Sequence, residues 1–129
     1  MGAPLTATLP TVEQATGSLL YQHTLALVRF FHGLDDPTRV AILELLLERE
    51  KSVGELVERL GRFQGRVSSH LACLRWCGYV RSRREGRNVY YALADERIRD
   101  LLVLAHTLAG EHAGALSTCS VLGGKTGDA

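Results

Sequence analysis

The sequence has few cysteines and no long apolar run. Its 129 residues include three cysteines, an odd number that excludes a complete disulfide framework and favours a reducing compartment. No apolar run approaches the roughly 20 residues that a membrane-spanning helix requires. The N-terminus lacks the basic start and apolar block of a secretory signal. We therefore expect a cytoplasmic protein with no membrane partner.

Charge is nearly balanced over the chain but unevenly distributed along it. The net charge is +1, over a length that suits one compact domain. Residues 1–61 carry five basic and eight acidic side chains, residues 62–87 carry seven arginines and one glutamate, and residues 88–129 carry three basic and five acidic side chains. The basic middle segment indicates a face that binds a polyanion, with nucleic acid the first candidate. A solvated arginine-rich surface is the alternative interpretation.

Apolar residues recur at helical spacing in the first half of the chain, after an arm with little apolar pattern. The spacing predicts a first helix over residues 12–34. Asp36 and Pro37 predict the start of a second helix, because aspartate accepts hydrogen bonds from free amides and proline suits the first helical position. Ser52 and Glu55 have the spacing of a capping box for a third helix.

A fourth helix is predicted over residues 64–77. Three apolar residues form a narrow stripe on its core-facing side, namely Val67, Leu71 and Leu74. Cys73 and Cys77 lie on a flank of that stripe and not within it. This helix therefore presents thiols beside the core and a polar face away from it.

After the fourth helix, the spacing of apolar residues changes from that of a helix to that of a strand. Two β-prone runs, Tyr79–Arg84 and Asn88–Leu93, flank Glu85-Gly86-Arg87 and predict a hairpin with glycine at the turn. Asp95 is the predicted cap of a last helix, which fades near Gly114. Two short helices followed by an arginine-tipped hairpin predict a winged helix-turn-helix.

The predicted fold class is therefore mainly α with a small β-hairpin, a dimeric winged helix-turn-helix. We divide the chain into a mobile N-terminal arm (1–11), a winged helix-turn-helix domain with dimerisation helices at both ends (12–114), and a flexible tail (115–129). The terminal helices carry more apolar surface than one small core covers, which indicates a two-fold interface. Such a homodimer would read a palindrome with half-sites about one turn apart.

This fold predicts that the fourth helix enters the major groove of duplex DNA. The hairpin would lie along a phosphate backbone or the adjacent minor groove. For His70, packing between helices is the alternative to a phosphate contact. The predicted DNA-binding residues are Gln64, Arg66, Ser68, Ser69, His70, Arg75, Arg83, Arg84 and Arg87.

Four sequence blocks in order resemble the ArsR/SmtB family of winged-helix repressors. They are Asp35–Leu43, Val67–Leu74, Cys77–Val80 and Glu85–Leu93. The resemblance covers roughly residues 20–110. It implies a homodimer that represses its operator until an inducer, commonly a metal ion, releases the DNA. The chain departs from the family at Phe63, where serine or threonine usually caps the recognition helix, and at Gly65 and Arg66, which replace small polar residues.

The three cysteines are candidate metal ligands. Cys73 and Cys77 are one helical turn apart, so their Cβ atoms lie about 6 Å apart on one face. Two thiolates alone make a poor site, and Cys119 is the only cysteine left to complete it. Sulfur ligands favour soft ions, so we expect Cd(II) or Pb(II), with Hg(II) or Zn(II) as alternatives. The resemblance is closest to the cadmium/lead sensors of the CmtR type, which implies that Cys119 comes from the other subunit.

These features predict a metal-released transcriptional repressor and not an enzyme. A thiol-redox sensor of the same fold is the first alternative, since residues four apart on a helix are within disulfide range. A further alternative is that Cys73 and Cys77 are packing residues in a protein that binds DNA constitutively. A thiol enzyme using Cys73 and His70 has no evident orienting acid or oxyanion site. Zinc on the last helix is disfavoured because His106 and His112 do not share a face.

Overall fold

The computed structural model describes residues 18–117. The predicted arm, the start of the predicted first helix and Cys119 lie outside the described residues. In chain order the elements are α2 (Ser18–His32), α3 (Pro37–Glu48), β1 (Lys51–Ser52), α4 (Val53–Leu60), α5 (Gln64–Trp76), β2 (Val80–Glu85), β3 (Asn88–Leu93), α6 (Glu96–Glu111) and α7 (Ala113–Ser117).

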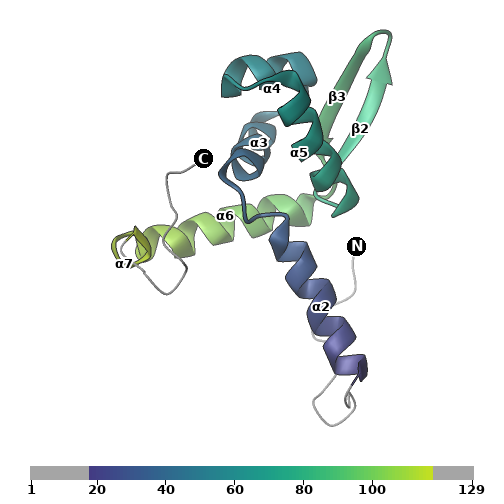
Figure 1. The fold of residues 1–129 in the computed structure, drawn as a ribbon. Helices are drawn as coiled ribbons and strands as arrows, with labels where there is room; N and C mark the ends of the chain where they lie inside the picture. The colour runs from purple at the N-terminus through teal and green to yellow at the C-terminus, as the bar shows by residue number, and fades with distance from the viewer. Residues whose placement is uncertain (1–17, 118–129) are drawn as a thin grey trace.

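The helices and the sheet form a body from which two helices extend. Figure 1 shows α3, α4 and α5 gathered beside the β2–β3 hairpin, with α6 crossing below them and α2 running outward. The hairpin projects as a wing next to α5. This arrangement confirms the predicted mainly α fold with a β-hairpin.

The predicted starts of the second, third and last helices are confirmed, together with their caps. The Asp36 side chain accepts a 3.0 Å hydrogen bond from the amide of Arg39 at the start of α3. Ser52 and Glu55 make both bonds of the capping box at the start of α4. Asp95 caps α6 in the same way as Asp36 caps α3. These caps satisfy amide groups that a helix leaves unpaired at its N-terminus.

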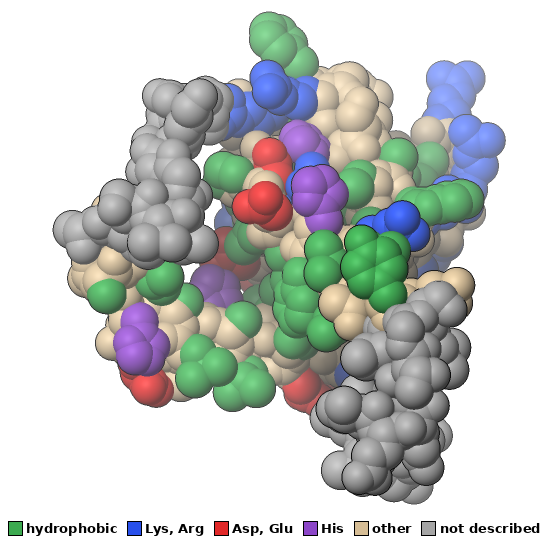
Figure 2. Space-filling view, turned by 60° about the horizontal axis from the view of Figure 1, so that its bottom comes forward, with side chains coloured by type: hydrophobic (Ala, Val, Ile, Leu, Met, Phe, Trp, Pro, Cys, Tyr) green, Lys and Arg blue, Asp and Glu red, His purple; other side chains and the backbone are tan. Residues whose placement is uncertain are grey.

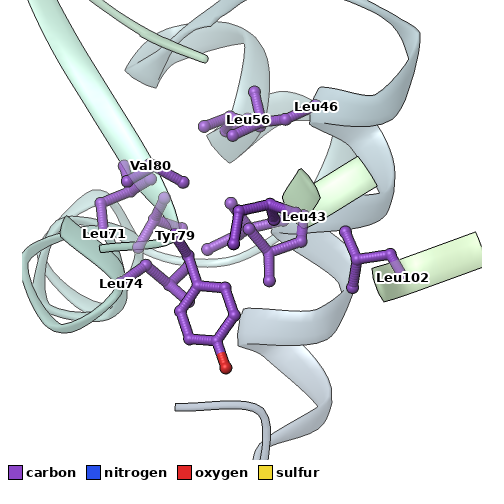
Figure 3. Packing of buried hydrophobic residues seen from close by; sticks show 11 residues of the cluster. Leu43, Leu46, Leu56, Leu71, Leu74, Tyr79, Val80 and Leu102 are labelled. Atoms are coloured by element: carbon purple, nitrogen blue, oxygen red, sulfur yellow. The ribbon is translucent and has the colours of Figure 1, made fainter. Parts of the chain in front are cut away.

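The core lies where the helices of the body meet the sheet. Figure 3 shows leucines of α3, α4, α5 and α6 packed around Tyr79 and Val80. The buried apolar side chains are Ile42, Leu43, Leu46, Leu56, Val67, Leu71, Leu74, Tyr79, Val80, Ile98 and Leu102. The predicted α5 stripe is therefore fully buried, which fixes the rotation of α5 about its axis. Its opposite side faces outward, and Trp76 there is 92% exposed.

The sheet has three strands, one more than the predicted hairpin. β2 and β3 pair antiparallel over their full lengths, with Gly86 in the left-handed region at the turn. β1, which consists of Lys51 and Ser52, pairs antiparallel with the other edge of β3. Two residues cannot show the alternation by which a strand is predicted. The short strand anchors the wing to the segment between α3 and α4.

The terminal helices leave large apolar side chains outside the core. On α2, α6 and α7 they are Tyr21, Leu27, Val28, Phe31, Val103, Leu104, Leu108 and Leu116, and Figure 2 shows hydrophobic side chains gathered on one such face. On α6, Ile98 and Leu102 are buried, whereas Ala105 and Leu108 are exposed. The short helix α7 continues past the point where the last helix is predicted to fade.

Candidate nucleic-acid interface and thiol site

The outward face of α5 is polar and accessible. Gln64, Arg66, Ser68 and Arg75 are exposed. Ser69 is exposed too, but its hydroxyl donates a 3.0 Å hydrogen bond to the backbone carbonyl one turn earlier. Within residues 18–117, neither Arg66 nor Arg75 forms an ion pair. Their charges are therefore available to an anion outside the protein.

The N-terminus of α5 has no side-chain cap, as the sequence predicts. Phe63 occupies the N-cap position, and its ring is 88% exposed. A Cβ placed on Gly65 would meet nothing within 4 Å. The first turn of this helix therefore has open space around it, which allows a large ligand to approach closely.

The three predicted wing arginines differ in their surroundings. Arg84 and Arg87 are exposed and form no ion pair with any described residue. Arg83 donates to both carboxylate oxygens of Glu50 at 2.8 and 2.6 Å and also binds Glu85. Two acidic partners thus balance the positive charge of Arg83. The charges of Arg84 and Arg87 are available to an anion outside the protein.

His70 faces the start of α3 and is mostly buried. Its Nε2 lies 3.7 Å from Oδ2 of Asp36, and its Nδ1 lies 3.4 Å from Nη1 of Arg39. Burial alone would raise the pKa of Asp36, but the amide of Arg39 and the charges of His70 and Arg39 lower it. These contacts favour the packing alternative for His70.

Cys73 and Cys77 are both free and half-buried, as a pair on the flank of α5. Burial raises the pKa of the Cys77 thiol, and the charge of Cys73 and a hydrogen bond with it raise this pKa further. Arg39 opposes these effects through its positive charge. The two thiols therefore affect each other's ionisation.

The described residues alone do not complete a metal site. Among residues 18–117, no group of three or more histidine, cysteine or acidic side chains could hold a metal ion. Cys119, the predicted third ligand, lies outside that range. A metal site built on this pair would need at least one further ligand.

The sequence does not indicate a functional role for two residues that influence the Cys77 region, Arg39 and Tyr79. The Arg39 side chain reaches the end of α2 and the His70 ring. Tyr79 is buried, stacks on Phe30 and donates a 2.7 Å hydrogen bond to its carbonyl oxygen. Tyr79 belongs to a β-prone run, and a strand pattern does not indicate a contact with a residue 49 positions earlier in the chain.

The chain is similar to known bacterial regulatory proteins. Residues 36–82 match the family described as bacterial regulatory protein, arsR family. A relative from Streptomyces lividans named probable mercury resistance operon repressor is 42% identical over 111 residues, which cover 86% of this chain and 89% of that protein. The HTH-type transcriptional regulator CmtR of Mycobacterium bovis is 48% identical over 73 residues, 57% of this chain and 62% of that protein.

A solved structure shares the fold. It is a homodimeric winged helix-turn-helix DNA-binding domain from Mycobacterium bovis, with a TM-score of 0.70 and 28% identity over 76% of this chain and 91% of that chain. The names of these relatives describe regulators and no enzymatic activity. No helix among the described residues is long and apolar enough to cross a membrane. The chain belongs to the ArsR family of bacterial regulatory proteins.

Proposed function

We propose that this protein is a metal-responsive transcriptional repressor. The metal-free homodimer binds a palindromic operator, and a soft metal ion, cadmium(II) or lead(II), releases it. One observation carries the proposal: Cys73 lies on α5 and Cys77 is its C-cap, and the same helix exposes Gln64 and Arg66. Capture of the ion and docking on DNA therefore act on the same rigid element.

The exposed side chains of α5 and of the wing support DNA binding. Glutamine and arginine read base edges in the major groove, and arginine also binds phosphates. Among the predicted contacts, the cations that form no ion pair with any residue of the described range are Arg66, Arg75, Arg84 and Arg87. The matched Mycobacterium bovis structure is described as a DNA-binding domain. We assign base contacts to Gln64, Arg66 and Ser68, and phosphate contacts to the exposed arginines.

The apolar faces of the terminal helices support a homodimer. Leu27 and Val28 on α2, and Leu104 and Leu108 on α6, are each more than half exposed. Apolar side chains that gather on one exposed face, as in Figure 2, usually mark an interface. The matched Mycobacterium bovis domain is described as homodimeric. In a two-fold dimer the pair of α5 helices would enter successive major grooves on one side of the duplex.

The thiol pair supports a soft ion as the inducer. Thiolate sulfur favours cadmium, lead, mercury and zinc over magnesium or manganese. Cys119 of the partner subunit completes the site in this proposal, because Cys73 and Cys77 supply only two ligands. The relative from Streptomyces lividans is named for mercury resistance, so mercury(II) is tested beside cadmium(II) and lead(II).

In this proposal, a single coupling free energy links the binding of metal to the binding of DNA. Metal weakens DNA binding by the same factor by which DNA weakens metal binding. To move the protein from almost fully bound to almost fully free, this coupling must reach about 5 kcal/mol. Metal bonds to two residues of α5 and one of the partner's tail would restrict how α5 settles in the groove.

A metal titration followed by absorbance tests the proposal. Cadmium(II), lead(II), mercury(II) and zinc(II) are added separately to the reduced protein, with and without a DNA fragment from upstream of its own gene. Thiolate-to-metal charge-transfer bands report the number of sulfur ligands, and fluorescence anisotropy reports DNA release. Cys73→Ser and Cys119→Ser should abolish release at the cadmium concentration that frees the wild type. His106→Gln is the matched control and should respond normally.

The thiol-redox sensor remains the second candidate, and it rests on the closeness of Cys73 and Cys77. A redox sensor usually has a thiol of lowered pKa, but burial and Cys73 raise the pKa of Cys77. A metal ion displaces the thiol proton and does not need a lowered pKa. Release of DNA by hydrogen peroxide, with no release by any of the four metals, would favour the redox sensor and overturn the metal proposal.

A further inference from the structure

Arg39 joins the end of α2 to α5 through a single guanidinium group. Its Nε donates a 2.7 Å hydrogen bond to the carbonyl oxygen of Gly33, and its Nη2 donates a 3.0 Å hydrogen bond to the carbonyl oxygen of His32. Its Nη1 lies 3.4 Å from Nδ1 of His70 on α5. A side chain from α3 that also touches α5 thus binds two carbonyl oxygens at the C-terminal end of α2, where the His32 oxygen accepts from the amide of Asp35 as well.

The position of Arg39 is itself fixed by its surroundings. Its amide donates to the Asp36 carboxylate, and the same carboxylate oxygen lies 3.7 Å from the His70 ring. Arg39 is half-buried, and its positive charge acts on the Cys77 thiol. The guanidinium therefore joins the last turn of α2 to His70, which lies one helical turn before Cys73 on α5.

A second contact fastens the same end of α2. Tyr79 stacks on Phe30 with ring centroids 4.5 Å apart, and its hydroxyl donates a 2.7 Å hydrogen bond to the Phe30 carbonyl oxygen. In Figure 3 the Tyr79 hydroxyl points away from Leu71 and Val80. A Cβ on Gly33 would lie 2.9 Å from the Tyr79 ring, so this close approach requires glycine.

The direction of α2 matters because α2 carries apolar surface of the proposed dimer. The last residue but one of α2, Phe31, is exposed, and so are Val28 and Leu27. If α2 turns relative to α5, the separation of the two α5 helices in the dimer changes. Two recognition helices bind a palindrome well only when their separation matches the half-site spacing.

We propose that Arg39 is a positioning residue that transmits metal capture at Cys73 and Cys77 to α2, and so sets the spacing of the two recognition helices. The inference rests on the proposed function. Arg39 contacts neither the metal nor the DNA in this scheme. Its loss should therefore weaken the coupling between the two ligands while leaving each separate affinity nearly unchanged.

The test uses Arg39→Lys in the full chain, with Arg99→Gln as the matched control. Lysine keeps the charge but cannot bridge two carbonyls and His70 together, and Arg99 pairs only with Glu96 on the surface of α6 in the described structure. Operator affinity is measured by anisotropy with and without cadmium(II), and cadmium affinity by absorbance on free protein. We expect the ratio of the two operator affinities to fall about tenfold or more in Arg39→Lys and to stay at the wild-type value in Arg99→Gln.

Each outcome decides the proposal. A wild-type ratio in folded Arg39→Lys would overturn it. If circular dichroism shows that Arg39→Lys is unfolded, Tyr79→Phe replaces it, because phenylalanine keeps the stacked ring and removes only the bond to Phe30. A reduced ratio in Tyr79→Phe supports transmission through the end of α2, and an unchanged ratio excludes it. Absence of a thiolate–cadmium band or of DNA release in the wild type is a different result, which refutes the proposed function itself.

Discussion

Arg83 of the wing and Glu50, which lies between α3 and β1, form a bidentate ion pair, with N–O distances of 2.8 and 2.6 Å. The Arg83 guanidinium also lies 4.6 Å from the centroid of the Tyr90 ring. The hydrogen bond from Arg83 lowers the pKa of Glu50, so the pair is ionised at neutral pH. A fork of this kind orients the hairpin relative to the body as well as neutralising charge.

The salt dependence of DNA binding should show which wing arginines contact phosphates. Each neutralised phosphate adds about −0.9 to the slope of log affinity against log salt concentration. Arg87→Gln should therefore reduce the magnitude of the slope by about one in each protomer. Arg83→Gln should change it less, because Glu50 and Glu85 already balance that charge. Equal changes of slope in both variants, measured by anisotropy over a salt series, would contradict this assignment.

The missing cap of α5 should be repairable. Phe63→Ser introduces a hydroxyl that can accept a hydrogen bond from a free amide of the first turn, and such caps stabilise by about 0.5–2 kcal/mol relative to alanine. The ring of Phe63 is 88% exposed, so its removal should cost little. Urea unfolding of Phe63→Ser and Phe63→Ala should show the serine variant as the more stable. Equal midpoints would mean that the first turn is already satisfied.

Local features of the fold could be predicted from the sequence. The caps at Asp36, Ser52 and Asp95 depend on residues only two or three positions away, and all three are present. The buried stripe of α5 follows from helical geometry alone. The flank position of Cys73 and Cys77 follows from the same geometry, and both are half-buried.

Features that depend on distant partners could not be predicted. The sequence shows seven arginines in residues 62–87 but not that Glu50 binds one of them from 33 positions away. Likewise, nothing in the first turn of α3 indicates that Arg39 turns back to α2. Strand β1 consists of two residues and has no pattern of its own. Pairing across the fold decides which charges of a basic segment remain available for DNA.

The proposed dimer interface predicts the effect of a charge on α2. Leu27→Glu places a carboxylate on an exposed apolar position, so the monomer should keep its fold while the dimer is weakened. Sedimentation should show a shift towards monomer, and operator affinity should fall at least tenfold because one recognition helix binds much more weakly than two. Gln22→Glu, exposed on the same helix, is the control for charge alone. A dimer as stable as the wild type would place the interface elsewhere.

Cadmium affinity should rise with pH through the neutral range. Burial and the neighbouring Cys73 raise the pKa of Cys77 above its ordinary value of 9.0, so this thiol carries its proton at pH 7 and must lose it to bind a metal. The proton becomes easier to remove as pH increases, so the apparent affinity increases. Calorimetry in two buffers of different ionisation enthalpy counts the protons released, and Cys77→Ser should release about one fewer than the wild type. The same count in both proteins would exclude Cys77 as a thiolate ligand, whereas a lower count with a weaker charge-transfer band would identify it as one.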